Sequence, residues 1–318
     1  MGDAVPGVPD RIPRNVSGEE RRRVTTPRDP LLPRREREVG PTAVSTERGA
    51  TLGPSMDDET QPLGRDDFDR FARHYDDEHA SYTDDLPMWE GFAYRSSEAP
   101  ILELACGTGR VLFSVARLGL DITGIDLSPA MLDITRAKAA ASKLSGRVTV
   151  EEGDMRAFSL GRQFGMAFIA LNSLMHLESR AEQRRAFASV RRHLSAGGRF
   201  IIDVFNPEEA LPDPSQESQL LLHCLKQRPD GSQLLHFQSV SVNRGAQLVS
   251  VTNYYDDTGA DGTVRRHLAP FRLRYIHVGE LELMLEHEGF VVEDVYGSYD
   301  LEPFRTGSPR IVAVARAR

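Results

Sequence analysis

From residue 101 onward, short apolar runs alternate with longer segments in which apolar residues recur at helical spacing. The apolar runs predict strands at Ile101–Leu104, Asp121–Ile125, Val148–Glu151, Met166–Leu171 and Phe200–Val204. Helical spacing predicts helices at Val111–Leu118, after the N-cap Ser128 and Pro129, and at Ala181–Leu194, where Gly197–Gly198 ends the helix. Strands and helices that alternate across short turns predict an α/β, doubly wound, mostly parallel sheet covered on both faces.

A different pattern occupies residues 215–275. Strands are predicted at Leu234–Val242, Leu248–Tyr255 and Leu268–Tyr275, with a turn at Gly259–Gly262. This stretch is expected to form an antiparallel insertion that acts as a lid or cap. After it, a helix at Glu280–Glu288 and strands at Val291–Tyr296 and Ile311–Ala315 are expected to close the main sheet with an antiparallel pair.

The first sixty residues differ from the rest in being rich in proline and in charges of both signs. Such a segment buries too little apolar surface to offset its ordering entropy, so a disordered tail is expected, with an arginine-rich interaction arm as the alternative. Amphipathic helices are predicted around Phe68–Tyr75 and at Leu86–Tyr94. The expected division is a tail (1–60), lid helices (61–98), a core (99–210), a cap over the acceptor site (211–277) and closing elements (278–318).

Composition narrows the function classes. The net charge of −8 argues against an extended nucleic-acid surface, because such binding depends on neutralising phosphates. Two cysteines without a regular framework favour a reducing, cytoplasmic setting. Neither a membrane-spanning apolar run nor the apolar stretch of a secretory signal is evident, and no metal-ligand constellation is found. A monomer or a homodimer is expected.

The first predicted strand is followed by a glycine-rich turn and a helix. Gly107 and Gly109 allow close approach of the backbone to a ligand, and the following helix N-terminus offers free N–H groups. A dinucleotide fingerprint needs a third glycine where this chain has Leu112, which disfavours NAD and FAD. The turn also lacks the Lys-Ser/Thr pair of a P-loop.

Acidic residues at three strand ends indicate which ligand the turn binds. Glu103 precedes the turn, where a carboxylate would repel a pyrophosphate but suits the cationic amine of S-adenosylmethionine (SAM). Asp126, after the second strand, is placed to accept the ribose hydroxyls. Asp154 and Met155, after the third strand, fit the adenine amine and the adenine ring face.

Four motifs in order resemble the class I SAM-dependent methyltransferase family: ELACGTG (Glu103–Gly109), GIDLSPAML (Gly124–Leu132), EGDM (Glu152–Met155) and ALNSLMHL (Ala170–Leu177). The resemblance covers Asp66–Arg318 and implies a seven-stranded, Rossmann-like sheet with its last strand antiparallel. It also implies SAM across the carboxyl ends of the first four strands, with S-adenosylhomocysteine as product. The predicted cofactor-binding residues are Tyr75, Tyr82, Glu103, Ala105, Gly107, Gly109, Asp126, Leu127, Met131, Asp154, Met155 and Leu171.

The segment after the fourth predicted strand is expected to face the acceptor, since LNSLMHL is similar to the matching stretch of glycine N-methyltransferase-like enzymes. There Asn172 is predicted to orient the acceptor and His176 to take its proton, or His176 only braces the loop. Phe205 stands where the glycine enzyme carries an Arg, which predicts a less acidic, partly apolar acceptor. About half of a set of cap residues are expected to line the pocket: Tyr254, Tyr255, His267, Arg272, Arg274 and Tyr275.

The sequence thus predicts a SAM-dependent methyltransferase that acts on a small molecule, at nitrogen or oxygen or else at carbon, in a setting such as specialised metabolism. One alternative is a methyltransferase for a peptide or protein terminus, with the cap as a groove. The other is a SAM-binding regulatory module without catalysis.

Overall fold

The computed structural model describes residues 72, 75–76, 78–79, 81–96, 99–228 and 230–318 of the chain. The predicted tail and most of the first predicted helix lie outside these residues. Of that helix, Ala72, Tyr75, Asp76, Glu78 and His79 are described, and all five are helical.

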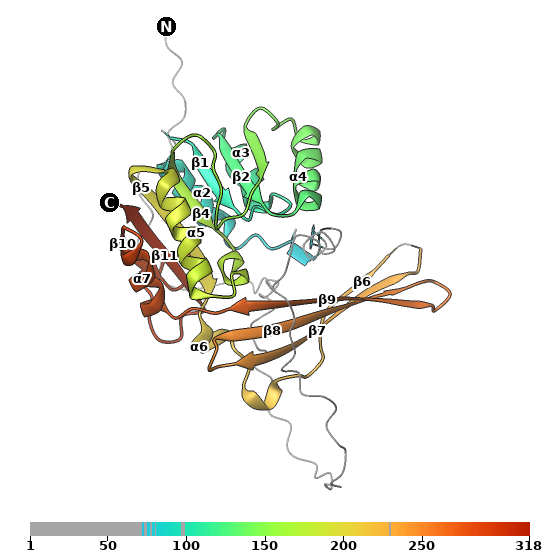
Figure 1. The fold of residues 1–318 in the computed structure, drawn as a ribbon. Coiled ribbons are helices and arrows are strands. Elements are labelled where there is room, and N and C mark those ends of the chain that lie inside the picture. The colour runs from blue at the N-terminus through green and yellow to red at the C-terminus, as the bar shows by residue number, and fades with distance from the viewer. Residues whose placement is uncertain (1–71, 73–74, 77, 80, 97–98, 229) are drawn as a thin grey trace, which may run out of the picture.

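The core is built on one seven-stranded sheet (Figure 1). Its strands are β1 (Ile101–Leu104), β2 (Ile122–Asp126), β3 (Val148–Glu152), β4 (Phe164–Ile169), β5 (Leu194–Phe205), β10 (Phe290–Tyr296) and β11 (Arg310–Ala317). They lie in the order β10-β11-β5-β4-β1-β2-β3. All neighbouring pairs are parallel except those of β11, which runs antiparallel to both β5 and β10. The predicted fold class is confirmed.

Helices cover both faces of this sheet (Figure 1). They are α2 (Leu86–Arg95), α3 (Arg110–Arg117), α4 (Pro129–Ala141), α5 (Arg180–His193) and α7 (Val278–His287). A short 3-10 helix, η1 (Ser173–His176), follows β4. Ser128 caps α4 as expected, since its hydroxyl accepts a hydrogen bond from the Met131 N–H at 3.2 Å. Side chains of β1 alternate between two apolar clusters, one shared with α5 and α7 and the other with α2 and α3.

The end of α5 differs from the prediction. The helix ends at His193, and β5 begins at Leu194 instead of Phe200. Gly197 and Gly198 therefore lie within the strand, where the register between β4 and β5 shifts between Phe164 and Met166. Gly197 has φ 77°, so the glycines serve this irregular pairing and not a helix stop.

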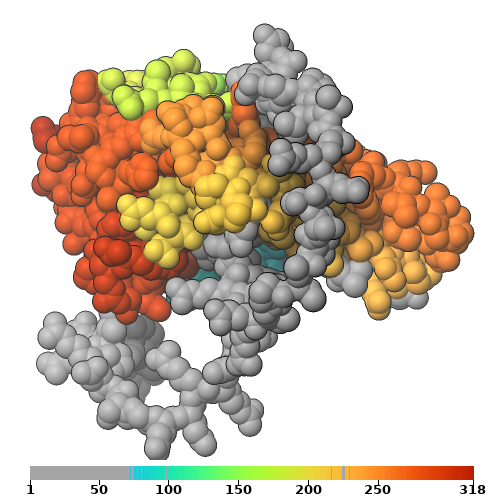
Figure 2. Space-filling model, turned by 90° about the horizontal axis from the view of Figure 1, so that it is seen from below, coloured from blue at the N-terminus to red at the C-terminus, as the bar shows by residue number. Residues whose placement is uncertain are grey.

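An antiparallel four-stranded sheet is inserted between α6 (Pro207–Ala210) and α7. After the short turn η2 (Pro214–Gln216), it consists of β6 (Leu221–Gln227), β7 (Gln233–Asn243), β8 (Leu248–Thr258) and β9 (Val264–Arg274), in that spatial order. The sequence analysis predicted the last three strands and missed β6. Seen from below, the insertion extends sideways beyond the core (Figure 2). We call it the cap.

Candidate active site

The glycine-rich turn lies between the carboxyl end of β1 and the start of α3. Gly107 and Gly109 have φ 53° and 85°, and a Cβ on Gly109 would lie 2.7 Å from the Phe113 ring. Asp126, at the end of β2, accepts hydrogen bonds from the N–H of Gly107 at 2.8 Å and from the N–H of Ser128 at 2.9 Å. The predicted turn and the predicted ribose carboxylate therefore form one rigid unit.

Glu103 is buried at the end of β1, with 3% of its surface exposed. Its Oε2 atom has no hydrogen-bond partner among the described residues. Burial raises the pKa of this carboxyl well above its ordinary value of 4.5, and the nearby Asp85 and Asp126 add to the rise while Arg110 opposes it. A buried carboxyl oxygen without a donor is costly unless a ligand supplies one, so this position fits the amine of SAM.

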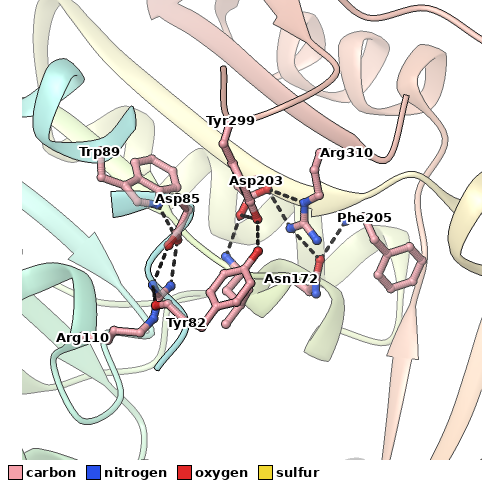
Figure 3. Close-up of polar contacts among 10 residues, drawn as sticks. Tyr82, Asp85, Trp89, Arg110, Asn172, Asp203, Phe205, Tyr299 and Arg310 are labelled. Atoms are coloured by element: carbon pink, nitrogen blue, oxygen red, sulfur yellow. Dashed lines mark hydrogen bonds and ion pairs between the residues drawn. The ribbon is translucent and has the colours of Figure 1, made fainter. Parts of the chain in front are cut away.

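A buried ion pair flanks Glu103, and the sequence analysis missed it. The Arg110 guanidinium donates to both carboxylate oxygens of Asp85 at 2.5 and 2.7 Å and to the Tyr82 carbonyl at 2.9 Å (Figure 3). The Trp89 indole N–H also donates to Asp85, at 2.9 Å. A signal was present, since Arg110 begins a mostly apolar helix, but Asp85 lies 25 residues earlier. The pair fixes the chain that precedes β1 against the glycine turn.

The two predicted lid tyrosines lie in different places. Tyr75 lies against the glycine turn, with its ring 3.8 Å from where a Cβ on Gly107 would be. Burial raises the pKa of the Tyr75 hydroxyl. Tyr82 instead donates its hydroxyl hydrogen to the Tyr299 hydroxyl at 3.1 Å. Tyr75 therefore lies at the turn that would face SAM, whereas Tyr82 lies beside the first residue of α3, with its ring 5.2 Å from the Arg110 guanidinium.

The residues predicted for adenine lie at the end of β3. The Asp154 carboxylate accepts hydrogen bonds from the Arg156 side chain, the shortest at 2.6 Å, and from the Arg156 N–H at 2.8 Å. Although partial burial raises it, these bonds hold the pKa of Asp154 below its ordinary value. Arg156 was not predicted at this site. Because it already donates to the Asp154 carboxylate, an adenine amine would share that carboxylate with Arg156. Met155 packs against the core, Leu127 is half-buried and Met131 is buried.

The loop after β4 begins with strained backbone. Leu171 and Asn172 have φ 48° and 65°, the left-handed region that side-chain-bearing residues rarely adopt. Asp203 of β5 holds both residues. Its carboxylate accepts the Leu171 N–H at 3.0 Å, and its carbonyl accepts the Asn172 N–H at 3.1 Å. Such strain persists only where the surroundings enforce it, and it is concentrated at functional sites.

Four buried or half-buried polar residues surround this strained loop, and we call them the Asp203 network: Asn172, Asp203, Tyr299 and Arg310 (Figure 3). Arg310 donates to Asp203 Oδ1 at 2.7 and 2.9 Å and to Asn172 Oδ1 at 3.0 Å. Asn172 Oδ1 also accepts the Phe205 N–H at 2.7 Å, and the Tyr299 hydroxyl donates to Asp203 at 3.2 Å. The amide oxygen of Asn172 therefore joins the ends of β4, β5 and β11.

His176 lies at the end of η1, beside the cap. Its ring is tilted against the ring of Phe271 in β9, with 5.6 Å between the ring centres. Burial lowers the pKa of His176 to about 4, so the imidazole is neutral at neutral pH. The structure thus brings a neutral histidine to the junction of the loop after β4 and the cap.

Phe205, from which a less acidic, partly apolar acceptor was predicted, is a core residue of the structure. Its side chain is 1% exposed and belongs to the apolar core. The residue opposite it on β11 is Arg310, so an arginine does reach the end of β5, but from the last strand. Arg310 is 4% exposed and is occupied by Asp203 and Asn172.

The cap residues proposed for the pocket divide by their contacts. Tyr255, Arg274 and Tyr275 are buried, whereas Tyr254, His267 and Arg272 are half-buried. The two arginines form ion pairs, Arg272 with Glu178 at 2.7 Å and Arg274 with Glu280 at 2.6 Å. They therefore anchor the base of the cap to the core.

Comparison with known proteins shows that this chain is similar to methyltransferases. Residues 101–198 match the family model of a methyltransferase domain. The putative methyltransferase YqeM of Bacillus subtilis is 34% identical over 155 residues, which are 47% of this chain and 61% of YqeM. The cypemycin N-terminal methyltransferase of a Streptomyces species is 25% identical over 236 residues, 70% of this chain and 86% of that protein. The CcbJ methyltransferase structure from Streptomyces caelestis superimposes with a TM-score of 0.69 at 28% identity, covering 79% of this chain and 97% of CcbJ.

The strand order, the glycine turn with Glu103 and Asp126, and these similarities define the class. They match those of the class I SAM-dependent methyltransferases, and residues 101–198 form a methyltransferase domain that uses SAM. Within the described residues, no helix is both long and apolar enough to cross a membrane.

Proposed function

We propose that the enzyme transfers the methyl group of SAM to an amine nitrogen of a small-molecule acceptor. The proposal rests on the surroundings of His176, whose half-buried ring packs against the Phe271 ring with 5.6 Å between the ring centres and whose pKa is lowered by burial to about 4. An imidazole with so low a pKa is a weak proton acceptor. A phenol or a carbon acid needs a general base before it can attack, whereas an amine that has lost one proton to solvent is already a nucleophile.

The chain's own residues then have mainly positioning roles. When bound, SAM supplies an electrophilic methyl group, and its transfer is an in-line displacement whose rate depends on alignment. Glu103 would bind the amine of the methionine part, Gly107 and Gly109 would allow close backbone approach, and Asp126 would bind the ribose. Asp154 and Met155 would bind the adenine.

On the acceptor side, Asn172 positions the loop, and the neutral His176 accepts a hydrogen bond from the acceptor amine. We place the cap over this acceptor, where it would exclude water. The enzyme is proposed to act in the cytoplasm, without nucleic acid or membrane as partner.

Relatives with amine acceptors support the choice of nitrogen. The cypemycin enzyme is, by its name, specific for an N-terminus. A second relative, a dTDP-3-amino-3,4,6-trideoxy-α-D-glucopyranose N,N-dimethyltransferase of Streptomyces venezuelae, is 34% identical over 110 residues, which are 44% of that protein. The second name describes methyl transfer to a nitrogen, and the first places the transfer at an N-terminus.

The test is turnover of a panel of acceptors by wild type and His176→Ala, followed by mass spectrometry. Sugar nucleotides with an amino group should gain one or two methyl groups, and their hydroxyl counterparts should gain none. We expect His176→Ala to lower kcat about tenfold, which is less than the loss of a general base costs. His287→Ala, which removes an exposed histidine of α7, is the matched control.

A loss of about a thousandfold or more in His176→Ala would identify the histidine as a general base and favour an oxygen or carbon acceptor. Methylation of hydroxyl compounds alone would contradict the proposal directly. The second candidate, a peptide N-terminus as acceptor, is favoured by the 86% coverage of the cypemycin enzyme. Peptides with free and with acetylated N-termini in the same panel distinguish the two.

A further inference from the structure

A polar cluster lies where the chain that precedes the core meets the cap. It consists of Glu78, from the helical segment that carries Tyr75, with His236 of β7 and Tyr255 of β8. The Glu78 carboxylate lies 3.6 Å from His236 Nδ1. The His236 ring stacks on the ring of Tyr255, with 4.8 Å between ring centres. After burial, the Glu78 charge is the largest cause that raises the pKa of the Tyr255 hydroxyl.

Two atoms of this cluster are buried without a hydrogen-bond partner among the described residues: Oε1 of Glu78 and Nε2 of His236. Residue His236 is only 5% exposed. With its proton on Nδ1, the nitrogen that faces Glu78, the imidazole presents Nε2 as an acceptor. The cluster therefore offers two acceptor atoms, one of them on a carboxylate.

The described part of the chain supplies no Lys or Arg to balance this carboxylate. The ion-pair neighbours of Glu78 are two histidines, His236 and His79, the latter at 3.9 Å. Burying an acceptor without a donor, and a carboxylate without a full countercharge, costs free energy. A ligand group that carries a positive charge and several N–H donors would recover that cost.

The cap connects this cluster to the acceptor loop. Val251 of β8 lies opposite Phe271, the residue that contacts the His176 ring, and Tyr255 follows four residues later on the same face. Four residues of strand span roughly 13 Å. Between Val251 and Tyr255, Asn253 accepts a hydrogen bond from Gln238 at 3.0 Å and donates one to the Tyr255 hydroxyl at 3.3 Å. Polar side chains thus lie between the residues beside the acceptor loop and the cluster.

We propose that Glu78 and His236 form a second subsite, which binds an ammonium group of the acceptor other than the nitrogen that is methylated beside His176. Because it presupposes an extended, amine-bearing acceptor on this cap face, the subsite rests on the proposed function. It makes the enzyme selective for acceptors with two basic groups separated by about the length of four strand residues.

The test needs no turnover, so it can fail independently of the proposed function. Full-length protein saturated with S-adenosylhomocysteine and labelled in its histidine rings is titrated with ethanolamine, or with the uncharged ethylene glycol, and followed by NMR. We expect ethanolamine to shift the His236 ring signals and ethylene glycol to leave them in place. In Glu78→Gln the ethanolamine shift should be lost, because the carboxylate no longer supplies the charge.

Glu286→Gln, which removes an exposed glutamate of α7, is the matched control and should behave as wild type. Retained affinity for S-adenosylhomocysteine in Glu78→Gln establishes that the variant is folded. If it does not fold, the wild-type comparison of the two probes decides the matter alone. Equal shifts with both probes, no shift with ethanolamine, or an ethanolamine shift that survives in folded Glu78→Gln would overturn the proposal.

Discussion

Glu103 is a carboxyl group that the fold buries before it has a ligand. Its pKa is raised well above 4.5 because burial disfavours the charged form, and Asp85 and Asp126 lie close by. The folded protein therefore holds the Glu103 proton more tightly than the unfolded chain does. Stability from this residue is present below about pH 4.5, where both states are protonated, and is lost as the pH rises above that value.

Glu103→Gln should therefore stabilise the protein without cofactor and weaken cofactor binding. We expect the free energy of unfolding at neutral pH to rise by about 1–3 kcal/mol, because an unsatisfied buried charge is removed. The difference from wild type should grow as the pH is raised from about 4.5 toward neutrality. Urea unfolding across this range measures it.

In the same variant, calorimetry should show that the affinity for S-adenosylhomocysteine falls by about tenfold, equivalent to about 1.4 kcal/mol. A stability difference that does not change with pH would contradict the assigned burial of the charge. Unchanged affinity would remove Glu103 from the cofactor site.

At the scale of elements, local patterns predicted the fold well. The glycine turn and the Ser128 cap depend on a few neighbouring residues, and both lie where the sequence placed them. The strand bounds differ from the predicted ones by up to six residues, at the start of β5. The Asp203 network was missed because its bonds join residues far apart in the chain, such as Arg310 and Asn172, which are 138 positions apart. The spacing of apolar residues and the amino-acid composition carry no information about such pairs. The strand β6 was missed because no clear alternation marks it.

Removing Arg310 should test how much the Asp203 network stabilises these elements. Arg310→Met leaves the Asp203 carboxylate, whose side chain is fully buried, without its countercharge. Breaking a buried pair in this way costs about 3–5 kcal/mol. Urea unfolding measures the loss.

Arg316→Met on the same strand is the control. Its side chain is 43% exposed and pairs with Glu293 at 2.9 Å, so its loss should cost about 0–1 kcal/mol. If the two variants lose similar stability, the Asp203 network is not what fixes β11 to β5.

At the scale of the whole molecule, the cap is held to the core mainly through its base. The buried Arg274 guanidinium donates to Gln183 of α5 at 2.8 Å, to Glu280 of α7 at 2.6 Å and to Gln247 of the β7–β8 turn at 2.9 Å. One side chain thus joins two core helices to the cap. The ends of the cap strands that are farthest from the core, by contrast, extend beyond it (Figure 2).

Arg274→Met should loosen the position of the cap without disturbing the cofactor turn. We expect KM for the amine acceptor to rise about tenfold while the affinity for S-adenosylhomocysteine changes by less than about twofold. Steady-state kinetics and calorimetry measure the two. Arg265→Met, at an exposed position of β9, should leave both unchanged. A parallel loss of both affinities would show that Arg274 supports the core in general and not the cap.

The place of Arg310 in the last strand has a consequence for how the protein is made. Synthesis runs from the N-terminus, so β1, β2 and the glycine turn leave the ribosome long before β11 does. The Asn172 side chain must wait for Arg310, 138 residues later, before the Asp203 network around the strained loop is complete. During biogenesis, the residues proposed to bind the cofactor are therefore all synthesised before the loop proposed to face the acceptor can be fixed.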